Sequence, residues 1–217
     1  MRNKTALWTL IALVAVMIAM TAWAYPRLPD VMVTHWGVDG RPDGTMTRFW
    51  GAWLMPLLSV GLAVLLWWVV PLIDPRQRNY AAFRGVYNGF IVGLVAFLAY
   101  IQGISLLWNL GYTVPIARAL APALGALFAG MGVLLQRAKP NWFVGIRTPW
   151  TLSSDTVWQE THRLAARAFY AAGALTVLGA VWMPFMWAGV GMVLLGALGT
   201  VVYSYIAYAR EQRTRGA

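Results

Sequence analysis

The stretch that decides the fold is GVYNGFIVGLVAFLAYIQGISLLW, residues 85–108, which has no charged side chain over its 24 positions. A helix of about 20 apolar residues crosses the roughly 30 Å hydrocarbon core of a bilayer. Residues 5–24, 51–73 and 116–135 have a similar length and almost no charge. Because 60% of the whole chain is hydrophobic and only 11% is charged, the sequence predicts an integral membrane protein.

The last apolar block, residues 164–208, is long enough for two crossings. Pro184 interrupts it, since proline cannot continue a helix. We therefore predict an all-α integral membrane protein of about six transmembrane helices, with a short extracytoplasmic loop domain and a structured cytoplasmic loop. The predicted segments are 1–50 (first helix and extracytoplasmic loop), 51–136 (helices two to four), 137–165 (cytoplasmic signature loop and helix start) and 166–217 (helices five and six with a basic tail).

The distribution of basic residues predicts the orientation of these helices. Of the 17 Lys and Arg residues, 13 lie on the side of both termini, and only Arg27, Arg41, Arg48 and Arg118 lie on the other side. Cytoplasmic segments carry an excess of Lys and Arg, so both termini are predicted to be cytoplasmic. The net charge of +10 then reflects contact with an anionic membrane surface rather than with nucleic acid.

The first hydrophobic stretch also resembles a secretory signal, because MRNK precedes it and the small-residue sequence AWA, residues 22–24, ends it. Its apolar run of about 20 residues is longer than the usual core of such a signal. We therefore expect an uncleaved first helix. Cleavage would remove one span and move the new N-terminus outside.

The first outer loop, residues 25–51, is predicted to contain a short strand and two turns. VMVTHW, residues 31–36, has strand character, and VDG (38–40) and PDG (42–44) are turn signals. His35, Asp39 and Asp43 have the side chains of metal ligands. Their spacing matches no recognised site, so we expect them to cap turns and to hydrogen-bond within the loop. No metal and no cofactor is predicted.

The second cytoplasmic segment, residues 73–90, begins with Asp74 and Pro75, which predict a helix start. Tyr80, Phe83 and Tyr87 share one helical face by their spacing. That face is interpreted either as an aromatic platform for a partner or as an interfacial belt. The amide of Asn79 is expected to need a partner if it is buried.

The third cytoplasmic segment is KPNWFVGIRTPWTLSSDTVWQETHRLAARAF, residues 139–169, and is unusually rich in polar and aromatic residues for a linker. Residues 139–150 are predicted to form a structured loop, because proline and glycine punctuate them. Ser153 or Ser154 is the predicted N-cap of a helix. On that helix Glu160 is expected to pair with Arg163 and Arg167. Three tryptophans are expected to rest the loop on the headgroup plane: Trp142, Trp150 and Trp158.

This segment resembles the signature of the SdpI family of bacterial membrane proteins. The match that we take as the candidate partner-binding or signature loop comprises Lys139, Pro140, Asn141, Phe143, Gly145, Arg147, Thr148, Pro149, Trp150, Ser153, Trp158, His162 and Arg163. The outer loop resembles the amino-terminal domain of unknown function of that family through Tyr25, Pro29, His35, Trp36, Gly40 and Asp43. Asp74, Pro75, Asn79 and Tyr80 extend the resemblance to the second cytoplasmic loop.

The resemblance implies a multi-pass protein of the bacterial cytoplasmic membrane that protects its producer against a secreted peptide toxin. It also implies that a small winged-helix repressor is held at the membrane when toxin is present. Toxin would meet the outer loop and the outer halves of the helices, and repressor would meet the signature loop. Formation of a homo-oligomer is left open.

Two alternative functions are a small transporter or channel subunit and a membrane-embedded metal-dependent enzyme. A transporter usually places ionisable groups at mid-membrane. Away from the ends where Arg118 lies, the predicted spans offer only neutral polar side chains, some of them near span ends: Ser59, Asn88, Gln102, Ser105 and Asn109. The only two histidines, His35 and His162, fall on opposite sides of the predicted membrane. No catalytic residue is therefore predicted, and the chain is not expected to be an enzyme.

Overall fold

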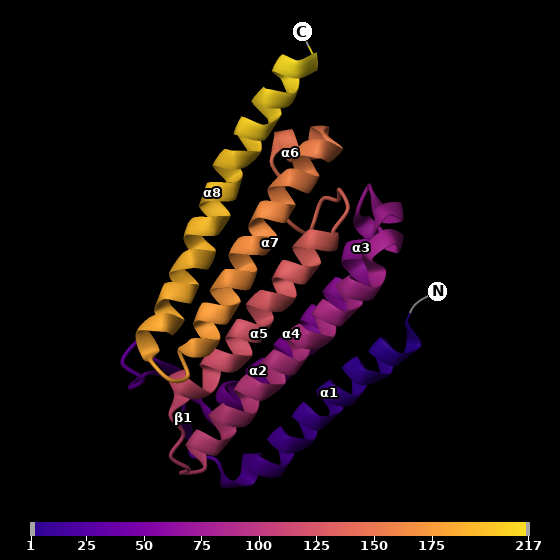
Figure 1. Cartoon of the computed structure of the whole chain (residues 1–217). Helices are drawn as coiled ribbons and strands as arrows, with labels where there is room; N and C mark the ends of the chain where they lie inside the picture. Colours follow the sequence, from indigo (N-terminus) through magenta and orange to yellow (C-terminus); the bar gives the residue numbers. More distant parts are fainter. Residues whose placement is uncertain (1–2, 216–217) are drawn as a thin grey trace.

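A computed structural model describes residues 3–215 as a bundle of long helices with one β-hairpin (Figure 1). The α-helices are α1 (Lys4–Ala24), α2 (Arg48–Val64), α3 (Val70–Ile73), α4 (Tyr80–Asn109), α5 (Ile116–Arg137), α6 (Pro149–Ser153), α7 (Asp155–Leu178) and α8 (Met183–Arg215). The strands β1 (Val31–Trp36) and β2 (Pro42–Thr47) form an antiparallel hairpin between α1 and α2. A π-helical turn, Leu65–Val69, joins α2 to α3, and a 3₁₀ turn, Gln77–Asn79, precedes α4.

Five helical segments are long and apolar enough to cross a membrane: Lys4–Arg27, Arg48–Ile73, Gln77–Asn109, Ile116–Arg137 and Met183–Arg215. This confirms the predicted all-α membrane fold. The helix α7 is more polar, because its first half carries charged side chains. It nevertheless returns the chain from the end of α5 to the start of α8, alongside both (Figure 1). A sixth span through α7 stays a prediction.

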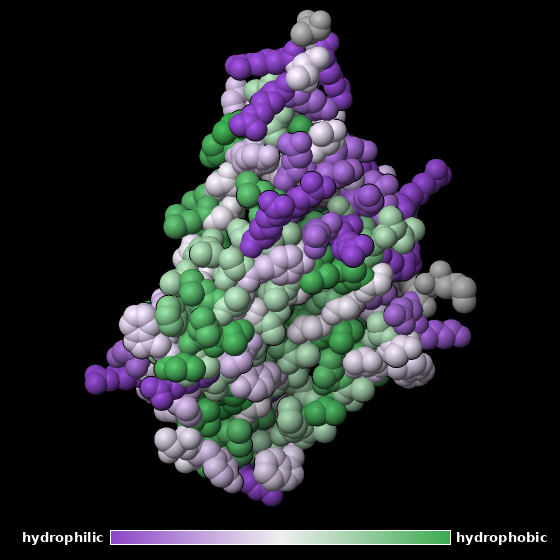
Figure 2. Space-filling view, in the orientation of Figure 1, coloured by the Kyte–Doolittle hydropathy of each residue, from purple (hydrophilic) through white to green (hydrophobic). Residues whose placement is uncertain are grey.

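The two ends of the bundle differ in structure. One end, called the loop end here, carries the signature loop (137–165), α3 and α6 (Figure 1). The other, the hairpin end, carries β1 and β2. Hydrophilic residues gather mainly at the ends, and a hydrophobic band crosses the middle (Figure 2). This layering is the one expected for a protein that crosses a bilayer.

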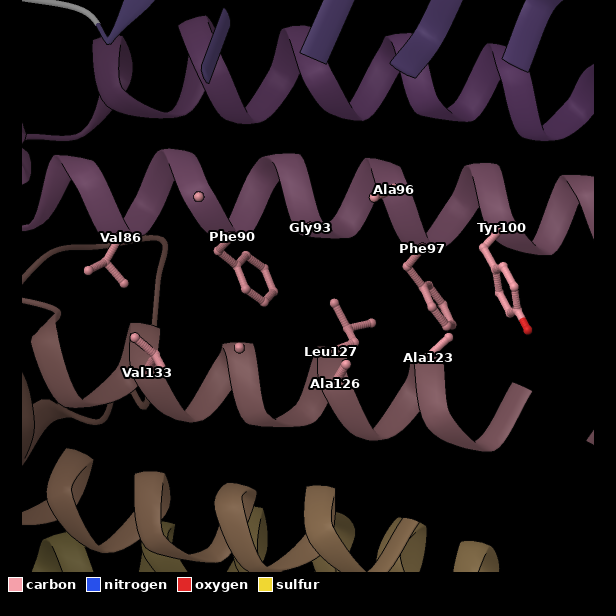
Figure 3. A pocket seen from close by; sticks show the side chains of 12 residues that line it. Val86, Phe90, Gly93, Ala96, Phe97, Tyr100, Ala123, Ala126, Leu127 and Val133 are labelled. Carbon is pink, nitrogen blue, oxygen red and sulfur yellow. The ribbon is translucent and has the colours of Figure 1, made fainter. Parts of the chain in front are cut away.

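The helices α5 and α7 pack closely because glycines face each other across the interface. A Cβ atom on Gly125 would lie 2.6 Å from the carbonyl oxygen of Gly173, and one on Gly132 would lie 2.8 Å from the Tyr170 ring. Small residues allow helix backbones in a membrane to approach in this way. By contrast, α4 and α5 leave an apolar groove of about 490 Å³ between them, into which Phe90 and Phe97 project (Figure 3).

The outer hairpin confirms one expectation and corrects another. The segment 31–36 is strand β1 as predicted, and residues 38–39 form a turn. The second predicted turn, at PDG (residues 42–44), is wrong, because these residues begin strand β2. Pro42 is tolerated as the first residue of a strand. Gly44 is needed for packing rather than turning, since a Cβ there would lie 2.9 Å from the Cβ of His35.

The amide of Asn109, the last residue of α4, attaches the hairpin to the bundle. Its Nδ2 donates to the carbonyl oxygen of Val33 at 2.9 Å, and its Oδ1 accepts from the Val33 N–H at 2.8 Å. Both backbone groups of one strand residue are therefore satisfied by a single helix residue. The hairpin is therefore hydrogen-bonded directly to the end of α4.

Candidate functional site

At the loop end, Asp74 connects the second loop to the signature loop. Its side chain is buried, and its carboxylate accepts hydrogen bonds from the Arg76 N–H (2.7 Å), the Tyr80 hydroxyl (3.0 Å) and the Trp142 N–H (2.9 Å). The predicted helix start at Asp74 and Pro75 is therefore wrong. Asp74 ends α3, and α4 begins at Tyr80, because the carboxylate closes a turn and binds the other loop instead.

The predicted aromatic face of α4 supports this contact. Tyr80, Phe83 and Tyr87 are all buried, and their ring centroids lie 5.2 to 6.1 Å apart. The Tyr87 hydroxyl donates to the carbonyl oxygen of Leu66 at 2.6 Å, within the π-helical turn. The predicted common face is confirmed. It is packed inside the protein and is not an open platform for a partner.

Asn141 organises the turn that follows Pro140. It is fully buried, its Nδ2 donates to the carbonyl oxygens of Lys139 and Val144, and its Oδ1 accepts from the N–H groups of Phe143 (2.9 Å) and Val144 (2.6 Å). The amide of Asn79 finds its expected partner here, since its Nδ2 donates to the Pro140 carbonyl oxygen at 2.6 Å. A second contact therefore links the two loops.

His162 holds the next part of the loop against α7. Its Nε2 accepts a hydrogen bond from the Ile146 N–H at 3.0 Å, and its Nδ1 lies 2.8 Å from the Trp158 carbonyl oxygen. Because Nε2 accepts, the proton is on Nδ1 and is donated to that carbonyl. Gly145 makes the approach possible: it has a φ of +106°, and a Cβ there would lie 2.1 Å from His162 Nε2.

The surroundings of His162 favour its neutral form. Its side chain is 2% exposed and stacks on the Trp158 ring at a centroid distance of 3.9 Å. Burial lowers the pKa of His162 to about 4 from its ordinary value of 6.5, although the hydrogen bond to Trp158 acts in the opposite direction. His162 precedes the predicted fifth span, and at neutral pH it serves as an uncharged acceptor.

The sequence predicted that Trp158 rests on the headgroup plane, and this prediction is wrong. Trp158 is fully buried, and its Nε1 donates to the Ala138 carbonyl oxygen at 2.9 Å. Trp142 is about half exposed, and Trp150 packs on Tyr205 of α8 with ring centroids 5.2 Å apart. The three tryptophans therefore have three different surroundings, which their spacing alone does not distinguish.

The predicted loop ends earlier than expected, because Pro149 is the first residue of the short helix α6. Thr148 and Thr151 form a capping box there, and the Thr148 hydroxyl lies 3.0 Å from that of Ser204 on α8. Ser154 is the N-cap of α7, which confirms one of the two predicted caps. Ser204 lies outside every predicted motif, and nothing local in the sequence indicates its contact.

The signature residues thus divide into a buried frame and an exposed face. The frame consists of Asn141, Thr148, Trp158 and His162, together with Asp74 and Tyr80 from the second loop. The exposed loop face is Trp142, Phe143 and Arg147, and the Arg147 guanidinium donates to the Trp142 carbonyl oxygen at 2.8 Å. Lys139, Pro149, Ser153 and Arg163 are also exposed.

The predicted outer-loop residues lie at the hairpin end, far from this frame. Tyr25 packs near Trp53, and Trp36 packs edge-on against Trp108. His35 hydrogen-bonds Asp43, and Asp39 accepts from the Arg41 N–H, as expected for loop-closing contacts. Pro29 lies between the 3₁₀ turn 25–27 and β1, and Gly40 has a φ of +77° in the hairpin turn. Within residues 3–215, no three His, Cys, Asp or Glu side chains are grouped to hold a metal.

Comparison with known proteins assigns the signature loop and the outer hairpin to two different family regions. Residues 137–204 match the SdpI/YfhL protein family, and residues 12–60 match a domain of unknown function, DUF1648. The chain is also 28% identical over 150 residues to the immunity protein SdpI of Bacillus subtilis (strain 168), which is 69% of each chain. No solved structure matches the chain. The family resemblance drawn from the residues is confirmed.

Proposed function

We propose that this membrane protein, which carries the SdpI/YfhL family region after a DUF1648 domain, gives a bacterium resistance to a secreted peptide toxin. The observation that carries the proposal is its similarity to an immunity protein over more than two thirds of the chain. In this proposal both termini lie in the cytoplasm, since 13 of the 17 basic residues are on their side. The hairpin end then faces the toxin.

A second part of the proposal assigns capture of a small winged-helix repressor to the loop end. Support comes from the exposed loop face, where Trp142 is 49% and Phe143 is 38% exposed beside Arg147. Tryptophan and arginine are enriched among the residues that dominate protein–protein binding energy. The buried frame holds their backbone in place, so little conformational entropy is lost when a partner docks.

The helix α4 is the proposed connection between the two ends. It has 30 residues and is therefore about 45 Å long. Asn109 at one end binds the hairpin, and Tyr80 at the other end donates to Asp74 in the frame. Toxin that favours one position of the hairpin would shift the population of α4 positions and, through Asp74 and Trp142, that of the loop face.

Toxin protection is tested in the bacterium itself by deleting this gene and growing the cells in medium conditioned by the parent strain. The deletion strain should be sensitive, and the wild-type gene should restore growth. Equal growth of the deletion strain and the parent would contradict the proposed immunity.

Repressor capture is tested separately by following a fluorescent repressor in cells exposed to toxin. Trp142→Ala/Phe143→Ala/Arg147→Ala should leave the repressor in the cytosol. A matched control removes two exposed apolar residues and an arginine at the same end of the bundle but outside the loop face, and should recruit the repressor like the wild type: Leu72→Ala/Ile73→Ala/Arg78→Ala. If the loop-face variant recruits the repressor as well as the wild type does, the loop face is not its docking site.

A further inference from the structure

A second pocket at the loop end lies between the C-terminus of α5 and the first half of α7. It has a volume of about 270 Å³. It is lined by Leu135, Gln136, Arg137, Ala138, Lys139, Gln159, His162 and Arg163. The exposed loop face contributes no residue to this lining, so the pocket is a separate feature.

The charges around this pocket are all positive. Arg137, Lys139 and Arg163 are exposed, and none of them forms an ion pair with a residue in the described part of the chain. Among the described residues, Glu160 pairs with neither Arg163 nor Arg167, so that prediction is wrong. The Glu160 carboxylate instead faces the Tyr203 hydroxyl of α8. No carboxylate lines the pocket.

The helix dipole explains only part of this arrangement. Arg137 lies in the last turn of α5, where a cation offsets the partial negative charge of the helix end. Arg163 is far from the C-terminus of α7 and gains nothing from that effect. Three like charges around one cavity repel each other unless an anion neutralises them.

The uncharged lining also suits an anion. The Gln136 Oε1 accepts from the Tyr170 hydroxyl at 2.9 Å, which fixes that amide and leaves its N–H groups as donors. His162 has its Nε2 filled by the Ile146 N–H, so it presents no acceptor to the pocket. The site therefore offers donors and positive charge.

We propose that this pocket binds a phosphate group, and that in the membrane the phosphate belongs to the headgroup of an anionic phospholipid. Arginine and lysine donors suit phosphate oxygens, and basic pockets between membrane helices at the cytoplasmic side bind such headgroups. A bound phosphate bridges Arg137 on α5, Lys139 at the loop start and Arg163 on α7. It thereby secures the entry of the signature loop, independently of any role in toxin resistance.

The test measures binding of fluorescent phosphatidylglycerol to the purified full-length chain in a neutral detergent. The variant Arg137→Gln/Lys139→Gln/Arg163→Gln should bind about tenfold more weakly, because three partly exposed charge contacts are lost together. Its matched control, Arg78→Gln/Arg210→Gln/Arg213→Gln, removes the same charge from exposed positions elsewhere and should bind like the wild type.

Three further probes on the wild-type chain identify the source of the phosphate and keep the test independent of variant folding. Added salt should weaken binding to the wild-type chain, and phosphatidylcholine, whose choline cation faces the same arginines, should bind more weakly. If millimolar inorganic phosphate displaces the fluorescent lipid, the pocket is a site for free phosphate. If it does not, the pocket is a site for the lipid headgroup. Equal lipid binding by the pocket and control variants, or insensitivity to salt, would overturn the proposal.

Discussion

Gly145 and His162 fit each other so closely that no side chain can stand at position 145: a Cβ there would lie 2.1 Å from His162 Nε2. The Ile146 N–H reaches that nitrogen only because Gly145 takes a φ of +106°. This pair holds the loop on α7.

Gly145→Ala should destabilise the loop by roughly 1–3 kcal/mol, since it adds both backbone strain and a direct clash. We expect a lower midpoint of thermal unfolding in detergent and faster proteolysis within residues 139–150. Gly103→Ala is the control, because a Cβ at this helical glycine of α4 meets nothing within 4 Å. A Gly145→Ala protein as stable as the Gly103→Ala protein would show that the fit is not required.

His162 should make stability depend on pH. Because its pKa is about 4 in the folded protein and 6.5 in the unfolded chain, the unfolded state binds more protons between these values. The contribution of His162 is therefore complete above pH 6.5 and is lost as the pH falls towards 4. Thermal unfolding at pH 7 and pH 5 measures the loss.

His162→Gln provides the comparison for that measurement, since a neutral amide has an acceptor for the Ile146 N–H and no proton to gain in this range. Its unfolding midpoint should change less between the two pH values than that of the wild type. The same change in both proteins would assign the pH dependence to other groups.

Asp74→Asn should loosen the contact between the two loops. An amide nitrogen replaces one of the acceptor oxygens that bind Tyr80, Arg76 and Trp142, and a buried donor that loses its acceptor costs about 1–3 kcal/mol. Thermal unfolding should report the loss, and hydrogen exchange of the Trp142 amide should accelerate. Asp155→Asn, at an exposed residue in the first turn of α7, should change little. Equal effects of the two substitutions would show that the Asp74 carboxylate does not hold the two loops together.

Asn109→Ala should release the hairpin from α4, because it removes both hydrogen bonds to Val33. Hydrogen exchange of the Val33 amide should accelerate, while that of the Ile146 amide at the loop end should stay slow. If α4 connects the two ends as proposed, toxin-dependent recruitment of the repressor should also fall. Unchanged exchange at Val33 would show that the hairpin is held by other contacts.

Local signals predicted many elements of this fold. The apolar stretches gave the long helices, Pro184 marks the start of α8, and VMVTHW forms β1. Ser154 caps α7 as its neighbours predict. Each of these signals acts over a few residues, so the element can be predicted without knowledge of the tertiary structure.

Contacts between distant residues were not predictable in this way. Asp74 has the residue type and position of a helix cap, yet its carboxylate binds the backbone of Trp142, which is 68 residues away. Likewise, Pro42 to Gly44 look like a turn but pair with β1, and Trp158 looks interfacial but packs under the loop. In each case tertiary packing overrides a local preference. The distant contact that does so cannot be read from the residues next to that position.

The most direct measurement of the proposed immunity is growth of the gene-deletion strain in medium conditioned by its parent, with the amount of protein in the membrane followed by immunoblot. Deletion should make the cells sensitive, and the wild-type gene should restore growth. Normal growth of the deletion strain, or continued sensitivity although the wild-type protein is present in the membrane, would contradict the proposed immunity.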